Sequence, residues 1–203
     1  MTLEEAIAKI KPLDHNAMEI AQKRWDSIAK PLHSLGKLET LLIQIAGITG
    51  NAEVDLSRRG LIVMCADNGV VEEGVTQTGQ EVTAIVAENF LKYDTAVGVM
   101  CKQNHAEIFP VDMGMVTDTK VRTDHKIAYG TQNMAKGPAM TREQAVKGLE
   151  AGIDMVRELN DKGYRILATG EMGIGNTTTS SAVASVLLKQ PVEEMTGRGA
   201  GLT

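Results

Sequence analysis

Aromatic residues are scarce in this sequence, where they make up 3% of 203 residues. Aliphatic side chains, alanines and 11 methionines must therefore fill the core, and the flexible methionine side chain suits irregular gaps. Cysteine occurs only at Cys65 and Cys101, each among apolar neighbours and without the spacing of metal ligands. Both are predicted to be buried free thiols of a protein in a reducing compartment, the cytoplasm.

Runs of basic residues are also absent, and the formal net charge is −5. This balance disfavours nucleic acid and anionic membrane surfaces as partners. The longest apolar run, Leu61 to Ala66, is far too short to span a bilayer, and the first residues lack the features of a signal peptide. The four histidines lack zinc-site spacing and no serine lies in a nucleophile elbow, so we expect neither a metal site nor an α/β-hydrolase.

The first 50 residues have the pattern of three helices. Apolar residues recur at helical spacing, and cap residues or prolines separate the stretches. The helices are expected after a capping box of Thr2 and Glu5, from His15 to about Ile28, and from a cap at Ser34 to about Gly47.

Short apolar runs alternate with helical patterns further along the chain. The predicted strands are Leu61–Cys65, Ala106–Val111 (where Pro110 indicates an edge or a bend) and Arg165–Thr169. The predicted helices are about Glu81–Leu91, one opening at Thr141 with an apolar face of Val146, Leu149, Ile153 and Val156, and one after Asn176. This alternation predicts an α/β fold: a parallel sheet flanked by helices in a Rossmann-like three-layer arrangement.

The change of pattern divides the chain into two predicted parts. Residues 1–50 are expected to contribute helices to a small helical domain. Residues 51–203 are expected to form an α/β nucleotide-binding domain that is incomplete.

Each predicted strand is followed by an acidic residue with a glycine within two positions. The acids are Asp67, Asp112 and Glu171. Ligands of open parallel sheets bind outside the carboxyl ends of strands, so these loops are candidate ligand contacts. The alternative is plain turn chemistry, because acids and glycines commonly end strands and cap helices.

The segment 170–179 is the richest in candidate chemistry. It reads Gly-Glu-Met-Gly-Ile-Gly-Asn-Thr-Thr-Thr between a predicted strand and a predicted helix. Glycines let the backbone curl, and free amides at a helix start can hold a phosphate. Asn176 stands where a P-loop has its lysine, which favours a monophosphate over a nucleoside triphosphate; a purely structural turn is the alternative. A second glycine segment, 196–201, could wrap a ligand with Arg198 as its anion partner, or be a flexible end.

Several segments together resemble the nicotinate-nucleotide–dimethylbenzimidazole phosphoribosyltransferase family. They are 30–39, 63–70 (Val-Met-Cys-Ala-Asp-Asn-Gly-Val), 73–75, 81–84, 137–140 (Gly-Pro-Ala-Met) and 170–178, in order. The resemblance spans nearly the whole chain. It implies an enzyme, a pentosyltransferase of cobamide lower-ligand assembly. The reaction would move phosphoribose from nicotinate mononucleotide to 5,6-dimethylbenzimidazole or a related base, giving α-ribazole 5′-phosphate and nicotinate without a metal or redox cofactor.

The resemblance also implies a set of substrate contacts. The nucleotide is expected to contact Glu171, Gly173, Gly175, Asn176, Thr177, Thr178, Gly199 and Ala200, with Glu171 as a supporting acid. The base is expected to lie near Thr78, Val86 and Met172. Family members often have glutamine where Val86 stands, so a more apolar base pocket is expected.

Two departures from the family pattern affect these expectations. Leu32 and His33 replace a proline and a glycine of a family turn, which changes the turn rather than the chemistry. The family sequence continues past Thr203, and its general-base glutamate lies in that later part. We therefore expect the chain to be C-terminally truncated and weakly active or inactive alone.

A homodimer is expected by resemblance. The alternatives are a non-catalytic nucleotide-binding or assembly module that needs a partner chain, and an isomerase using Asp67 and Glu171 as acid and base.

Overall fold

The computed structural model describes residues 1–200 and divides the chain into two compact units. The first comprises Thr2–Ser57, and the second begins at Arg58. The three helices expected in the first 50 residues all belong to the first unit.

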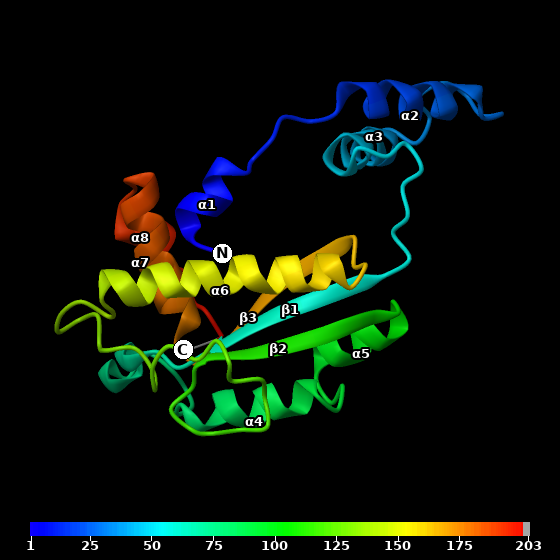
Figure 1. Ribbon diagram of the computed structural model, residues 1–203. Coiled ribbons are helices and arrows are strands. Elements are labelled where there is room, and N and C mark those ends of the chain that lie inside the picture. The colour runs from blue at the N-terminus through cyan, green and yellow to red at the C-terminus, as the bar shows by residue number, and fades with distance from the viewer. Residues whose placement is uncertain (201–203) are drawn as a thin grey trace. The chain divides into compact units, whose positions relative to one another are not determined.

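The first unit consists of helices joined by turns (Figure 1). They are α1 (Leu3–Ala8), α2 (His15–Ser27) and α3 (Lys37–Thr49). The predicted capping box of Thr2 and Glu5 begins α1, and the Asp14 carboxylate accepts a hydrogen bond from the Ala17 amide at the start of α2. Helices α2 and α3 pack closely because Gly47 lacks a side chain: a Cβ there would lie 2.7 Å from Met18.

The turn between α2 and α3 corrects one prediction. Ser34 does not cap α3; the N-cap is Gly36, whose φ of 55° is costly for other residues, and it makes no side-chain capping bond. Glu39 organises the turn instead. Its buried carboxylate accepts from the Leu35 amide and pairs with Lys30 Nζ at 2.9 Å, and this hydrogen bond from Lys30 lowers the pKa of Glu39.

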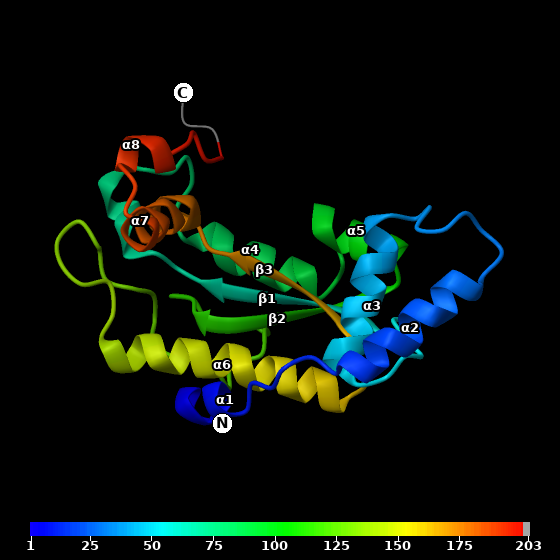
Figure 2. The same cartoon turned by 90° about the horizontal axis from the view of Figure 1, so that it is seen from above.

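The second unit is the predicted α/β layer structure (Figures 1 and 2). Its elements are β1 (Arg59–Ala66), the 3₁₀-helix η1 (Gly69–Glu73), α4 (Glu81–Phe90), α5 (Ala96–Gln103), β2 (Ala106–Gly114), α6 (Arg142–Asp161), β3 (Ile166–Met172), α7 (Asn176–Leu188) and α8 (Val192–Met195). The strands are parallel in the order β2-β1-β3, with α6 along one face and α4 and α5 along the other. The prediction of a parallel sheet flanked by helices is confirmed, and β2, which contains Pro110, is an edge strand of the described sheet.

Three details of the second unit differ from the sequence prediction. Strand β3 extends to Met172, so Gly170 and Glu171 belong to the strand and not to the loop. Helix α5 was not predicted; it begins at Thr95, whose side chain accepts from the Gly98 amide. The predicted apolar face of α6 is wrong, because its buried side chains are instead Ala151, Met155 and Leu159. Leu149 and Val156, which were assigned to that face, are exposed.

The core lies in two clusters, one on each face of the sheet. The face toward α4 and α5 buries the first cluster: Leu61, Val63, Cys65, Ala84, Ala87, Phe90, Cys101, Met115 and Val121. The face toward α6 buries the second: Ile62, Val111, Met155, Leu159 and Tyr164. This alternation along β1 follows from the period of two in a strand. The cysteines are buried free thiols, as predicted, and burial raises the pKa of Cys65 to about 12.

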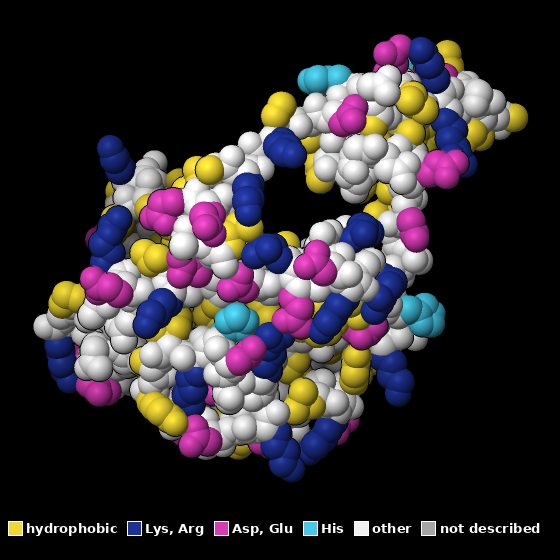
Figure 3. Space-filling view, in the orientation of Figure 1, with side chains coloured by type: hydrophobic (Ala, Val, Ile, Leu, Met, Phe, Trp, Pro, Cys, Tyr) yellow, Lys and Arg dark blue, Asp and Glu magenta, His cyan; other side chains and the backbone are white. Residues whose placement is uncertain are grey.

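The surface of the second unit has no single-sign charge patch on the face shown in Figure 3, where basic and acidic side chains are interspersed. Across the described residues, no helix combines the length and the apolar character needed to cross a membrane.

Candidate functional site

The order of the strands determines where a ligand can enter. From β1 the chain crosses through α4 and α5 to β2 on one side, and then through α6 to β3 on the other side of β1. The segments that follow β1 and β3 therefore diverge at the carboxyl edge of the sheet, at a topological switch point. This is where the segment 173–178 lies, between β3 and α7.

Two glycines give the segment after β3 its shape. A Cβ on Gly173 would overlap the Ala66 carbonyl oxygen and would lie 3.0 Å from Asn68 Nδ2. Gly175 has φ of 88° and is the N-cap of α7, so it has the left-handed conformation that glycine tolerates best. Both residues are buried. The backbone can therefore approach the end of β1 and then turn sharply into the helix.

The start of α7 presents backbone amides that its own turns do not satisfy. The Asn176 amide bonds the Gly173 carbonyl at 3.0 Å, whereas Thr177 and Thr178 occupy the next positions of the first turn, where amides lack an intrahelical acceptor. Among the residues that the structure describes, no side chain caps this end of the helix. A helix N-terminus of this kind favours an anion such as a phosphate.

A cleft of about 700 Å³ opens over this helix start. Three segments line it: 74–78, which follows η1; 172–178, with Ser181 of α7; and 196–200, which follows α8. Gly199 lies directly against Thr177, because a Cβ there would be 2.8 Å from the Thr177 hydroxyl oxygen. The structure thus brings together nine residues of the predicted site: Thr78, Met172, Gly173, Gly175, Asn176, Thr177, Thr178, Gly199 and Ala200.

Two predicted site residues do not line the cleft. Glu171 is exposed on β3, and its carboxylate accepts a hydrogen bond from the side-chain amide of Asn176, through which it reaches the cleft wall. Val86 packs against the core cluster on the α4 face and does not line the cleft. Its predicted contact with the base therefore stays a prediction. Arg198, named as an anion partner, is in the lining.

The acids after β1 and β2 have a structural role. Asp112 Oδ1 accepts from the Gly114 and Met115 amides, and its Oδ2 pairs with Lys126 Nζ at 3.1 Å. Asp67 Oδ2 accepts from the Val116 amide at 2.8 Å. Both carboxylates are completely buried, so they shape the turn after β2 and do not face a ligand.

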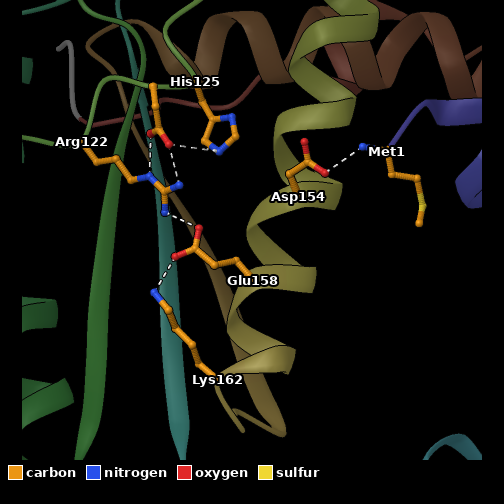
Figure 4. Close-up of polar contacts among 7 residues, drawn as sticks. Met1, Arg122, His125, Asp154, Glu158 and Lys162 are labelled. Carbon is orange, nitrogen blue, oxygen red and sulfur yellow. Dashed lines mark hydrogen bonds and ion pairs between the residues drawn. The ribbon is translucent and has the colours of Figure 1, made fainter.

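The long connection between β2 and α6 is tied to the helix by ion pairs (Figure 4). Arg122 donates two hydrogen bonds to Asp124 and one to Glu158 of α6, which also accepts from Lys162. Lys162 and then Arg122 lower the pKa of Glu158, and Arg122 lowers the pKa of Asp124. The network fixes the segment that follows the carboxyl end of β2.

Some residues around the cleft were not identified from the sequence. Asn68 Nδ2 donates to the Ile174 carbonyl, and Thr83 Oγ1 accepts from the Ile174 amide. Asn68 directly follows a strand-end acid, which is a usable signal. Thr83 lies within the family-like segment 81–84, but its helical pattern there gives no sign that its hydroxyl contacts Ile174. In the part of the chain that the structure describes, no group of three or more histidine, cysteine or carboxylate side chains is arranged to hold a metal ion.

Comparisons with known proteins identify the family of the chain. The profile of a family described as "Phosphoribosyltransferase" matches residues 10–203. The nicotinate-nucleotide–dimethylbenzimidazole phosphoribosyltransferase of Ruminiclostridium cellulolyticum is 51% identical over the whole chain, and that of Clostridium tetani is 47% identical over 99% of it. The crystal structure of CobT from Thermus thermophilus superposes with a TM-score of 0.84 at 37% identity, over 93% of this chain and 57% of that one.

The aligned region covers nearly all of this chain but only part of each relative. The chain spans 58% of the Ruminiclostridium protein and 56% of the Clostridium tetani protein. The similarity nevertheless covers nearly every residue of this chain, including the strands, the glycine segment and the cleft lining. The chain therefore belongs to the phosphoribosyltransferase family that includes the nicotinate-nucleotide–dimethylbenzimidazole phosphoribosyltransferases.

Proposed function

We propose that this chain provides the nucleotide-binding part of an enzyme that transfers phosphoribose from nicotinate mononucleotide to 5,6-dimethylbenzimidazole or a related base, in cobamide lower-ligand assembly. The observation that carries the proposal is the cleft over the start of α7, where glycines and uncapped amides of 173–178 meet the 196–200 segment. Relatives that share this sequence are named for the reaction. The products would be α-ribazole 5′-phosphate and nicotinate.

The phosphate of the mononucleotide would lie against the first turn of α7. Thr177 and Thr178 present amides there, and the lack of a P-loop lysine suits a monophosphate. Gly199 and Ala200 would form the opposite wall. In the reaction the glycosidic bond to nicotinate breaks as the azole nitrogen of the acceptor bonds to the anomeric carbon with inversion, and nicotinate leaves with the bonding electrons.

The acceptor base would lie beside the nucleotide, near Thr78 and Met172 in the cleft and with Val86 behind them. Glu171, held by Asn176, would act on the ribose or the reacting base. The glutamate that takes the proton from the attacking azole belongs, by resemblance, to family sequence beyond Thr203. Such a base contributes about 10²–10⁴-fold in rate, so turnover by the 203-residue chain alone is expected to be weak or absent.

Two further properties are proposed from the resemblance and the buried thiols. The active protein would be a homodimer, and it would work in the cytoplasm, where Cys65 and Cys101 stay reduced.

Nicotinate release from nicotinate mononucleotide plus a benzimidazole tests the proposal. The assay compares the 203-residue chain with a form extended to the full family length. Base-dependent release by the longer form, with mononucleotide binding by both, is the expected result. Nucleotide binding without base-dependent turnover in either form would instead support a non-catalytic module.

The isomerase alternative is disfavoured by the position of Asp67. This carboxylate is completely buried and accepts a hydrogen bond from the Val116 amide, so it cannot exchange protons with a ligand in the cleft. Conversion of a sugar phosphate without any acceptor base would instead support the isomerase alternative.

A further inference from the structure

Ile174 is the residue at the centre of the glycine segment, and side chains from elsewhere in the chain hold both of its peptide groups. Its amide donates to Thr83 Oγ1 of α4 at 3.0 Å, and its carbonyl accepts from Asn68 Nδ2 at 3.0 Å. The partners are 91 and 106 residues away in sequence. The conformation of this segment is therefore determined by the end of β1 and by α4, not by local turn chemistry alone.

Thr83 is well placed for this task. Its side chain is completely buried in the first turn of α4, so water cannot replace the contact. Burial raises the pKa of the Asp67 carboxyl, and the nearby Thr83 hydroxyl partly offsets this effect. Asp67 is fixed in turn by the Val116 amide and by backbone bonds to Gly114 and Thr131. Thr83 thus links the glycine segment to the carboxyl edge of the sheet.

Asn68 completes the arrangement on the other side. Its carbonyl oxygen Oδ1 accepts from the Thr179 hydroxyl in the first turns of α7 at 3.3 Å, and its backbone carbonyl accepts from Gln80 Nε2 just before α4. One side chain therefore contacts both the glycine segment and the helix whose amides face the cleft.

We propose that Thr83 and Asn68 are positioning residues that hold the Ile174 peptide and so aim the amides of the α7 start at a nucleotide phosphate. Neither residue lines the cleft. The inference rests on the proposed function, because it specifies how the phosphate end of the mononucleotide is recognised. The inference adds that affinity for the phosphate depends on the Thr83 hydroxyl group, which does not itself line the cleft.

The test is a matched pair of variants at one buried position. Thr83→Val keeps the shape of the side chain but removes the hydroxyl, and Thr83→Ser keeps the hydroxyl. Calorimetry with the 203-residue chain measures the Kd of nicotinate mononucleotide and of nicotinate riboside, which lacks the phosphate. For Thr83→Val we expect mononucleotide affinity to fall about tenfold, as loss of an oriented hydrogen bond implies, with the riboside little changed. Thr83→Ser should recover most of the loss.

The outcomes separate this inference from the proposed function. If the unmodified chain binds the mononucleotide and Thr83→Val binds it equally well, the positioning role is wrong while the proposed function stands. Equal weakening of mononucleotide and riboside would also overturn the role, because general loosening of the fold would then explain the loss. If the unmodified chain does not bind the mononucleotide, the proposed function is wrong.

Hydrogen exchange at the Ile174 amide tests the contact without any ligand. Protection in the unmodified chain and its loss in Thr83→Val are expected, whereas unchanged protection would contradict the contact. Should Thr83→Val fail to fold, Asn68→Ser replaces it, because Asn68 is only partly buried and we expect the smaller side chain there to preserve the core. The same phosphate-specific loss of affinity is then expected.

Discussion

At the scale of single residues, the cleft depends on positions where a side chain does not fit. Gly173 lies against the Ala66 carbonyl and the Asn68 side chain, and it is buried. The need for glycine here comes from the approach of two backbones, not from an unusual φ at this residue.

We expect Gly173→Ala to destabilise the fold by about 1–3 kcal/mol, since an added methyl in a packed site must displace backbone. It should also weaken mononucleotide binding at least about tenfold, because the amides of α7 move with the loop. Urea unfolding and calorimetry measure the two effects. Gly152→Ala is the control: in α6 its Cβ meets nothing within 4 Å, and alanine there should stabilise by about 0.5–1 kcal/mol. Unchanged affinity in Gly173→Ala would contradict the close approach.

Glu171 has a different role in the same region, because its carboxylate is held by Asn176 at the edge of the cleft. In a full-length form we expect Glu171→Ala to lower kcat/KM. The expected decrease corresponds to a loss of about 2–4 kcal/mol in transition-state stabilisation, as loss of a charged contact implies. Steady-state kinetics with both substrates measure the effect. Glu171→Gln, which keeps an acceptor for Asn176, separates charge from positioning. Wild-type kinetics in Glu171→Ala would remove this residue from the site.

At the scale of elements, the two ends of helix α7 differ in their capping. No side chain of the described residues 1–200 caps its N-terminus, which suits an anion, whereas its C-cap is Lys189 in the left-handed conformation, with φ of 54°. A side chain in this conformation costs about 1–2 kcal/mol, and glycine avoids that cost.

Lys189→Gly is therefore expected to raise the free energy of unfolding by about 0.5–1 kcal/mol, the larger chain entropy of glycine in the unfolded state offsetting part of the gain. Lys189→Ala removes the same charge but keeps the strained conformation, so it should give no comparable gain. Urea unfolding compares the two. Equal stabilisation by both variants would assign the effect to the charge instead.

The connection between β2 and α6 depends on Arg122, which joins Asp124 and Glu158. Because the pKa values of both carboxyls are lowered in the folded protein, the ion pairs stabilise it above the ordinary carboxyl pKa values and lose this contribution as pH falls through the folded values.

Arg122→Met should cost about 1 kcal/mol at pH 7, a modest figure because the groups are partly exposed and screened. The difference from the unmodified chain should be smaller at pH 3, which lies below the ordinary pKa values of both carboxyls. Urea unfolding at both pH values measures it, with Lys147→Met in the exposed part of α6 as control. A difference that persists unchanged at pH 3 would show that packing, not charge, explains the loss.

At the scale of the whole molecule, much apolar surface of the second unit is exposed. Helix α7 has no buried residue, and four of its large apolar side chains are exposed: Val183, Val186, Leu187 and Leu188. The chain spans little more than half the length of the relatives it matches. Contiguous exposed apolar surface promotes association.

We expect the 203-residue chain to bind a hydrophobic dye such as anilinonaphthalene sulfonate and to self-associate as its concentration rises. The double variant Val186→Lys with Leu187→Lys should reduce both effects, as measured by fluorescence and sedimentation. Gln103→Lys, at an exposed polar position of α5, adds charge without removing apolar surface and should leave both unchanged. A similar reduction in Gln103→Lys would attribute the association to net charge.

Local rules determined much of this protein from the sequence. The apolar run of β1 is continuous because both faces of the strand are buried, and the capping boxes at Thr2 and Thr141 mark helix starts by chemistry that is complete within four residues. The glycine segment 170–179 was identified for the same reason, since its residue types have few alternative uses. The predicted roles of the site residues remain predictions.

The tertiary structure decided what depends on neighbours far along the chain. Leu149 has the spacing of a core residue yet is exposed, because the sheet contacts α6 through the stripe of Ala151, Met155 and Leu159. Asp67 looked like a ligand contact but is buried, and Thr83 looked like an ordinary helix residue but holds Ile174 across 91 positions. Periodicity and helix caps depend on residues that are close in sequence, so they can be predicted from it. Burial and long-range hydrogen bonds form only when the parallel strands bring distant segments side by side.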